Sequence, residues 1–280
     1  MSLSGVFDYF SVRPRHPVGD DGRMALSDHF RELRARLLRS VLVLVVAFCV
    51  ALFFYDQLSD LIRVPYDEAK ARLGDRVSTE IVVSDVTGPL MLQLKLCGIV
   101  ALIVASPYWL YQIWAFILPG LHPSEKKWSR IFVAIAGPLF FAGVAVAYYV
   151  MPKALEVLIG FTPADATNLV DFEKFFSFLT RMFLVFGIAF EIPLFVIMLN
   201  LAGVISGKTL GRYRPWIVLG TFVFAAVATP STDPFSMVML AIPMLVLFFI
   251  AEVIARLIDR RRGRGASSTD NWADDEASPL

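Results

Sequence analysis

The sequence predicts an all-α membrane protein that crosses the bilayer several times. Of its 280 residues, 57% are hydrophobic and 18% are charged, and the mean hydropathy is +0.64. Soluble domains are closer to half apolar and a quarter charged. The chain also contains six apolar segments, most of them near the roughly 20 residues that a helix needs to cross a ~30 Å hydrocarbon core. We therefore expect one all-α domain with six transmembrane helices.

The six segments follow from the apolar runs in chain order. They cover Ser40 to Leu58, Leu90 to Leu118, Ile131 to Met151, Phe175 to Leu201, Trp216 to Thr229 and Phe235 to Ala255. The fifth is short, because Pro215 and Pro230 leave 14 residues between them, or about 21 Å of helix at 1.5 Å per residue. We expect it to thin the bilayer locally or to lean on neighbouring helices.

The polar segments divide the chain into three parts. Residues 1–23 are rich in proline and charge and are predicted to be an irregular extension, residues 24–256 form the membrane domain, and residues 257–280 are a basic and then acidic disordered tail. Within residues 26–39, Leu26, Phe30, Leu33 and Leu37 recur at helical spacing. This pattern predicts an amphipathic helix along the membrane interface that leads into the first span.

The basic residues predict the orientation of the spans. Of the 26 Lys and Arg residues, 18 lie before the first span, between spans two and three, between spans four and five, or after span six. The positive-inside rule therefore places both termini in the cytoplasm. The start of the chain lacks a short apolar segment before a cleavage site, so we expect no signal peptide.

The sequence contains no motif of a hydrolase, a metalloprotease or a nucleotide-binding enzyme. Its two cysteines, Cys49 and Cys97, lie inside apolar runs, which does not suit a disulfide framework or a zinc site. We expect no catalytic residue, no metal and no cofactor.

Two acids outside the spans have an ordinary interpretation on the residues alone. Glu32 and Arg36 stand four positions apart, as in a surface pair worth a few tenths of a kcal/mol. Glu125 suits the first turn of a helix, with Ser124 as a possible N-cap. By this reading neither acid needs a ligand.

Glu191 is the opposite case, because it lies inside the fourth apolar segment. A carboxylate at membrane depth is costly, so it points to a functional or partner-pairing role. Pro193 follows closely and cannot donate to the carbonyl of Ala189, which predicts a bend beside the acid.

Several stretches together resemble the TatC family of the twin-arginine protein translocase. They are "LSDHFRELRARLLRS", "SPYWLYQIWAFILPGLHPSEKK", "FGIAFEIPLF", "YRPWIVLGTFVFAAVATPSTDPFSM" and "LAIPMLVLFFIAEV". They occur in one order, and the resemblance covers Met24 to Arg256.

The resemblance implies a receptor for the signal peptides of folded cargo, which carry a consecutive Arg-Arg pair. Its recognition acids match Glu32 and Glu125, and a planar guanidinium suits a carboxylate. With the family match, both acids become expected ligands instead of ordinary surface charges. Arg34, Gln112 and Phe116 match positions that line the family's binding region.

The resemblance also implies partners and a location. TatA-like and TatB-like single-span subunits are expected to dock on the fifth and sixth spans, with Glu191 as the intramembrane acid. Thr229 is the candidate for polar contact with a partner helix, and Pro65 matches a proline of the first external loop. We expect a bacterial inner-membrane protein that forms homo-oligomers, contacts lipids but no nucleic acid, and supports export driven by the proton-motive force.

Two other functions remain open at this point. A proton-coupled transporter of small solutes would use Glu191 as its proton carrier, bind its ligand at the midplane and work alone. A passive membrane scaffold would leave the three acids replaceable. A receptor would instead bind a peptide at the cytoplasmic rim and need partner subunits.

Overall fold

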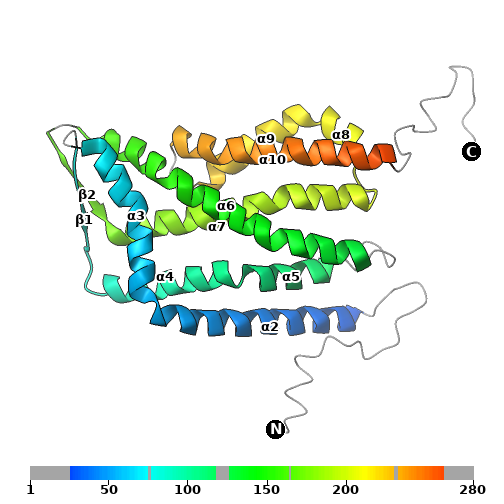
Figure 1. Cartoon of the computed structure of the whole chain (residues 1–280), viewed down its shortest axis with the longest axis horizontal. Helices are drawn as coiled ribbons and strands as arrows, with labels where there is room; N and C mark the ends of the chain where they lie inside the picture. The colour runs from blue at the N-terminus through cyan, green and yellow to red at the C-terminus, as the bar shows by residue number, and fades with distance from the viewer. Residues whose placement is uncertain (1–25, 75–76, 118–125, 164, 230–232, 262–280) are drawn as a thin grey trace, which may run out of the picture.

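The computed structural model describes residues 26–74, 77–117, 126–163, 165–229 and 233–261. Long helices lie side by side along one axis (Figure 1). They are α2 (Leu26–Phe53), α4 (Gly88–Val104), α5 (Ser106–Ile117), α6 (Lys126–Gly160), α7 (Phe172–Leu201) and α10 (Pro234–Arg261). The short helices α8 (Gly207–Arg212) and α9 (Arg214–Ala228) lie beside α10, whereas α3 (Tyr55–Leu73) crosses the bundle. We call the end with Leu26 and Arg261 the terminal end.

The opposite end carries two short strands, β1 (Ser78–Val82) and β2 (Thr167–Asp171), and we call it the strand end. The strands pair in parallel, with Ser78 opposite Thr167. They join the connection that precedes α4 to the connection that precedes α7. The sequence analysis did not predict them, but the rest of the described chain is helical as expected for an all-α protein.

Among the residues that the structure describes, four helices are long and apolar enough to cross a membrane, and a fifth span forms if α4 and α5 count together. These two helices bend by 56° at the break between them. Pro107 explains the break, because it has no N–H and its ring would clash with the carbonyl four residues earlier. The predicted span from Leu90 to Leu118 is therefore two helices. The remaining predicted span, between Pro215 and Pro230, is α9, which is short as predicted.

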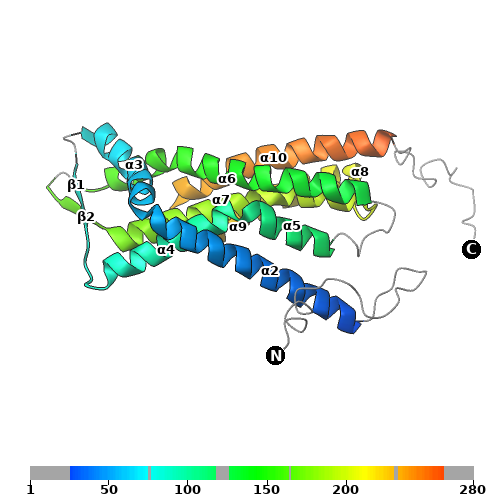
Figure 2. The same ribbon diagram turned by 60° about the horizontal axis from the view of Figure 1, so that its bottom comes forward.

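The beginning of the chain differs from the prediction. Residues 26–39 form no separate interfacial helix, because α2 runs without interruption from Leu26 to Phe53 and lies along the bundle (Figures 1 and 2). The first span ends at Phe53 instead of Leu58, and α3 begins at Tyr55. Pro65, which matches a proline of the first external loop, is buried inside α3, in the connection between the helices of the first two predicted spans.

The C-terminal helix also exceeds its predicted end. It continues to Arg261, so the first residues of the predicted tail 257–280 are helical. Residues 1–23 and the remainder of that tail lie outside the described residues.

Helices α6 and α7 meet at the centre of the bundle through two glycines. A Cβ on Gly143 would lie 2.5 Å from the carbonyl oxygen of Phe186, and a Cβ on Gly187 would lie 2.6 Å from the ring of Phe140. The missing side chains let the two backbones approach closely, as at other membrane helix crossings. Phe140 and Phe186 are fully buried there and fix how α6 and α7 pack.

Candidate functional site

Glu32 lies near the start of α2, at the terminal end. Arg36 donates from Nε at 2.8 Å and from a terminal guanidinium nitrogen at 2.5 Å to the same carboxylate oxygen, Oε1. The two side chains are only 11% and 14% exposed. The spacing of four residues was visible in the sequence, but this burial was not. The pair is thus unlike the freely exposed helix pairs that contribute little to stability.

Arg36 also links α2 to α5. Its second terminal nitrogen donates to Oε1 of Gln112 at 3.2 Å, and Gln112 is 4% exposed. Two of the predicted binding residues, Glu32 and Gln112, therefore lie on either side of one guanidinium. Arg36 was predicted only as the surface partner of Glu32, so its place between the two binding residues is new.

The other three predicted residues of this site are Arg34, Phe116 and Glu125. Arg34 is exposed on α2, and Phe116 is half-buried near the end of α5. Glu125 lies outside the described residues, directly before Lys126, the first residue of α6. The structure brings together Glu32 and Gln112, and it places Phe116 on the same helix as Gln112.

Glu191 lies inside α7, and both of its carboxyl oxygens are buried. Among the residues that the structure describes, none donates to them a hydrogen bond of normal geometry. The neighbouring donor is the indole of Trp114, on α5. Trp114 itself is buried, and its ring packs 6.2 Å from that of Phe195. A buried carboxyl without a hydrogen bond inside a span requires an explanation, and contact with a partner helix stays a prediction.

The two remaining predicted residues, Pro193 and Thr229, lie in the C-terminal half of the chain, as Glu191 does. Pro193 is buried in α7, which continues through it to Leu201, and it lines an apolar groove of about 330 Å³ with side chains of α6 and α10. Thr229 caps the end of α9, and its hydroxyl donates to the carbonyl of Ala225 at 2.9 Å. The role of Thr229 in partner contact stays a prediction.

A second acid cluster near the terminal end was missed by the sequence analysis. Glu252 on α10 is 1% exposed. Arg214, at the start of α9, bonds both of its oxygens at 2.7 Å, and Arg256 donates from Nε to Oε1 at 2.8 Å. Glu252 and Arg256 stand four positions apart in the sequence, and this spacing could have predicted their pair.

A neighbouring acid on α10, Asp259, joins that helix to the start of α8. It is 7% exposed and accepts hydrogen bonds from the Asn200 side chain at 3.0 Å and from the backbone N–H of Gly207 at 2.5 Å. A Cβ on Gly207 would lie 2.7–2.9 Å from Arg256, including its backbone. Glycine is therefore required for α8 to approach α10 this closely.

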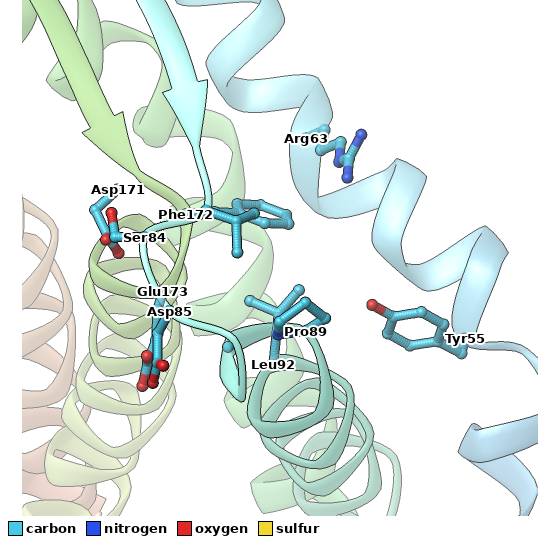
Figure 3. Close-up of a pocket in the computed structure, with 11 residues that line it drawn as sticks. Tyr55, Arg63, Ser84, Asp85, Pro89, Leu92, Asp171, Phe172 and Glu173 are labelled. Atoms are coloured by element: carbon cyan, nitrogen blue, oxygen red, sulfur yellow. The ribbon is translucent and has the colours of Figure 1, made fainter.

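The strand end holds a cavity of about 260 Å³ that contains none of the predicted site residues. Asp85, Asp171 and Glu173 lie on one side of it, and Arg63 reaches toward it from α3 (Figure 3). Most of these charges already have structural partners. Lys95 pairs with Glu173, and the Arg63 guanidinium lies 4.9 Å from the centre of the Phe172 ring.

The two aspartates of this cavity are also held in place. A hydrogen bond from Ser84, above all, lowers the pKa of Asp171, and one from Thr87 lowers that of Asp85. The described residues contain no group of three or more potential metal ligands. The Lys95–Glu173 pair and the Arg63–Phe172 contact beside this cavity join α4 and α3 to α7.

The fold and these charged clusters define a class of protein: a polytopic helical membrane protein with its predicted recognition residues at one end of the bundle. The chain belongs to the TatC family, since the model of the family described as Sec-independent protein translocase protein TatC matches residues 28–243.

Relatives with the same description share much of the sequence. The TatC protein of Frankia casuarinae is 38% identical over 271 residues, which cover 93% of this chain and 74% of the relative. That of Xylanimonas cellulosilytica is 38% identical over 242 residues, or 86% of this chain and 87% of the relative. The crystal structure of a twin-arginine translocase receptor, TatC, matches with a TM-score of 0.69 and 32% identity, and covers 82% of this chain and 98% of that chain.

These similarities confirm the resemblance inferred from the sequence. They also confirm the helical multi-pass fold, the location in the inner membrane and a role in protein translocation instead of enzymatic catalysis. They give no support to the alternative of a proton-coupled solute transporter.

Proposed function

We propose that this chain is the signal-peptide receptor of a twin-arginine translocase and that the peptide's Arg-Arg pair binds at the terminal end of the bundle. The observation that carries this proposal is Glu32, a largely buried carboxylate that already accepts two hydrogen bonds from a guanidinium. A site that holds one arginine in this way has the charge and the planar geometry to hold another. The similarity to a solved twin-arginine translocase receptor supports the same function.

Glu125 is proposed as the second recognition acid. It stands directly before Lys126, and both Ile117, where α5 ends, and Lys126, where α6 begins, lie at the terminal end (Figure 1). The two described residues that flank the segment with Glu125 therefore lie at the same end as Glu32. Two acids from different segments suit two adjacent arginines better than one acid does. Arg34, Gln112 and Phe116 are proposed to line the site.

The terminal end is proposed to face the cytoplasm, because the basic residues gather there. A reporter that is active only outside the cytoplasm should be silent when fused after Arg264 and active when inserted near Gly74, at the strand end. The reverse pattern would invert the orientation and place the acids on the wrong side for cargo recognition.

We propose TatA-like and TatB-like subunits as partners, with a homo-oligomer of this chain at the core of the receptor complex. The short helix α9 supports this, because its 15 residues, about 22 Å at 1.5 Å per residue, do not cross an undisturbed bilayer upright. A partner helix beside α9 and near Glu191 would cover this region. Transport itself is proposed to use the proton-motive force.

The experiment compares two signal peptides that differ only in an Arg-Arg or a Lys-Lys pair. The purified full chain should bind the Arg-Arg peptide more tightly, because lysine has no planar fork to match a carboxylate. Glu32→Gln or Glu125→Gln should weaken binding of the Arg-Arg peptide by roughly tenfold to a hundredfold, the loss of one charge-assisted contact worth about 1.5–3 kcal/mol.

Glu68→Gln is the matched control, since Glu68 lies on α3 with its side chain 51% exposed. It should bind both peptides like the parent. If both Glu32→Gln and Glu125→Gln bind the Arg-Arg peptide as tightly as the parent, the two acids are not its ligands.

A further inference from the structure

We propose that Arg36 is an internal substitute for the cargo arginine, and that a signal peptide binds by displacing it from Glu32. This inference rests on the proposed function, because it assumes that Glu32 receives an arginine of the peptide. It adds a residue, Arg36, that sets how tightly the receptor binds.

The first argument is chemical identity. The group that now occupies Glu32 is a guanidinium, held by two nitrogens at 2.8 and 2.5 Å. The proposed ligand presents the same group. A cargo guanidinium that makes a planar contact with both carboxylate oxygens needs Oε1 of Glu32, which already accepts both bonds from Arg36. Binding of a cargo arginine to Glu32 therefore competes with Arg36.

The second argument is burial. Glu32 and Arg36 are 11% and 14% exposed, so water would stabilise neither charge fully if the pair simply opened. Leaving a buried charge unpaired is costly. An exchange keeps Glu32 paired, because the incoming guanidinium replaces the outgoing one, and its cost is the displaced charge of Arg36.

The third argument is that Arg36 has a second acceptor. Its other terminal nitrogen bonds Oε1 of Gln112 at 3.2 Å. Arg36 thus keeps one hydrogen bond to α5 while it gives up those to Glu32. Gln112, which is 4% exposed, then acts as the position to which Arg36 withdraws.

The exchange has a quantitative consequence. The free energy of binding equals that of the new contact minus that of the Glu32–Arg36 pair, and the second quantity is the same for every ligand. Arg36 therefore lowers the affinity for the Arg-Arg and the Lys-Lys peptide by the same factor. The ratio between the two peptides depends on Glu32 and stays unchanged. Because every peptide must first break the Glu32–Arg36 pair, weakly matched peptides do not bind at cellular concentrations. The same cost makes release of bound cargo easier.

A different role would leave a different signature. If Arg36 only held Glu32 in the right orientation, its removal would disorder the carboxylate and would weaken binding. The loss would be larger for the Arg-Arg peptide, whose planar contact depends most on orientation, so the ratio between the peptides would narrow.

The test uses the full chain with Arg36→Gln and the two labelled signal peptides. Both affinities should rise by about tenfold, the value of a largely buried charge-assisted pair, and their ratio should stay as in the parent. Arg260→Gln is the control for net charge, because Arg260 is exposed in the last turn of α10 at the same end of the bundle. The gain is measured relative to this control.

Arg36→Lys provides a second variant that keeps the charge and with it the fold. Lysine competes for Glu32 without the planar fork, so affinity for both peptides should rise by about threefold. If Arg36→Gln does not yield folded protein by size-exclusion chromatography, this variant decides the question. Unchanged or weaker binding in the folded variants, or a narrower ratio between the peptides, would overturn the exchange.

The Glu32→Gln background separates this inference from the proposed function. Without the carboxylate there is nothing to compete for, so adding Arg36→Gln to Glu32→Gln should not change binding. If Glu32→Gln alone binds like the parent, the proposed recognition role of Glu32 fails, whatever Arg36 does. If Glu32→Gln weakens binding but Arg36→Gln does not strengthen it, only the exchange fails.

Discussion

Glu32 and Glu252 are both acids bonded by arginines toward the terminal end of the bundle, but their surroundings differ. Glu32 receives its two bonds from Arg36 on its own helix, through one oxygen. Glu252 receives bonds on both oxygens from Arg214 on α9 and Arg256 on α10. The Glu32 side chain is 11% exposed, and the Glu252 side chain is 1% exposed. We infer from this difference that the Glu32–Arg36 pair, which lies within α2, can open for exchange, whereas Glu252 joins α9 to α10 and supports the fold.

The difference has a physical basis. Releasing Glu32 from Arg36 separates no two elements, because both residues stay in α2. Releasing Glu252 detaches the start of α9 from α10 and leaves a buried charge without partners. Breaking a buried pair on one side is strongly destabilising, although the solvent exposure of Arg214 and Arg256, 49% and 44%, reduces the loss.

The largest effect is expected at the close contact of α8 with α10. Gly207→Ala places a methyl group within 3 Å of the Arg256 backbone, which has no flexible end to move aside. We expect a loss of about 3 kcal/mol, seen as an apparent unfolding midpoint in detergent that falls by roughly 6–12 °C. Gly220→Ala is the control, since a Cβ on Gly220 would meet no atom within 4 Å. Equal midpoints for the two variants would show that α8 is not held against α10.

The next effect separates the two acids directly. Glu252→Gln removes the charge that two arginines share, so stability should fall by about 2 kcal/mol. Glu32→Gln should lower stability by less, about 1 kcal/mol, because its amide oxygen still accepts from Arg36 and no second helix is released. Signal-peptide binding should show the opposite order, with the larger loss in Glu32→Gln. Unfolding midpoints and peptide affinities are measured on the same preparations.

The comparison requires that Glu252→Gln loses more stability and that Glu32→Gln loses more peptide affinity. If Glu32→Gln destabilises the protein as much as Glu252→Gln, the pair with Arg36 is a structural support and its exchange is excluded. If Glu252→Gln leaves stability unchanged but abolishes peptide binding, Glu252 belongs to the recognition site instead.

The sequence predicted the parts of the fold that depend on local pattern. The apolar runs gave the long helices, and Pro215 and Pro230 gave the short α9. The bend between α4 and α5 had a signal in Pro107 that the length of the apolar run obscured. The pairing of β1 with β2 and the bonds between Arg214 and Glu252 join residues far apart in the chain, so local pattern carried no information about them.

The candidate site, too, could be predicted from local sequence pattern only in part. Glu32 and Arg36 were recognised as a pair from their spacing, but spacing does not tell which side of a helix is covered. The contact of α5 with α2 buries the pair and brings Gln112 to Arg36. Glu191 was recognised because a carboxylate in an apolar run is rare, and the structure adds that its oxygens are buried.

Glu191 extends the comparison to a third acid, with the smallest expected effect on stability. Because no described residue donates it a normal hydrogen bond, Glu191→Leu breaks no bond within the described structure. We expect a change in stability within about 1 kcal/mol, together with normal signal-peptide binding. Recruitment of the single-span partners and export of folded cargo should nevertheless be lost, whereas Glu191→Gln should keep much of both, because an amide still donates and accepts. Cross-linking to the partner subunits and export of a folded reporter measure these functions. A leucine variant that recruits and exports normally would remove Glu191 from assembly. One that is as unstable as Glu252→Gln would make it a structural acid, because its carboxyl would then stabilise the bundle itself instead of awaiting a partner.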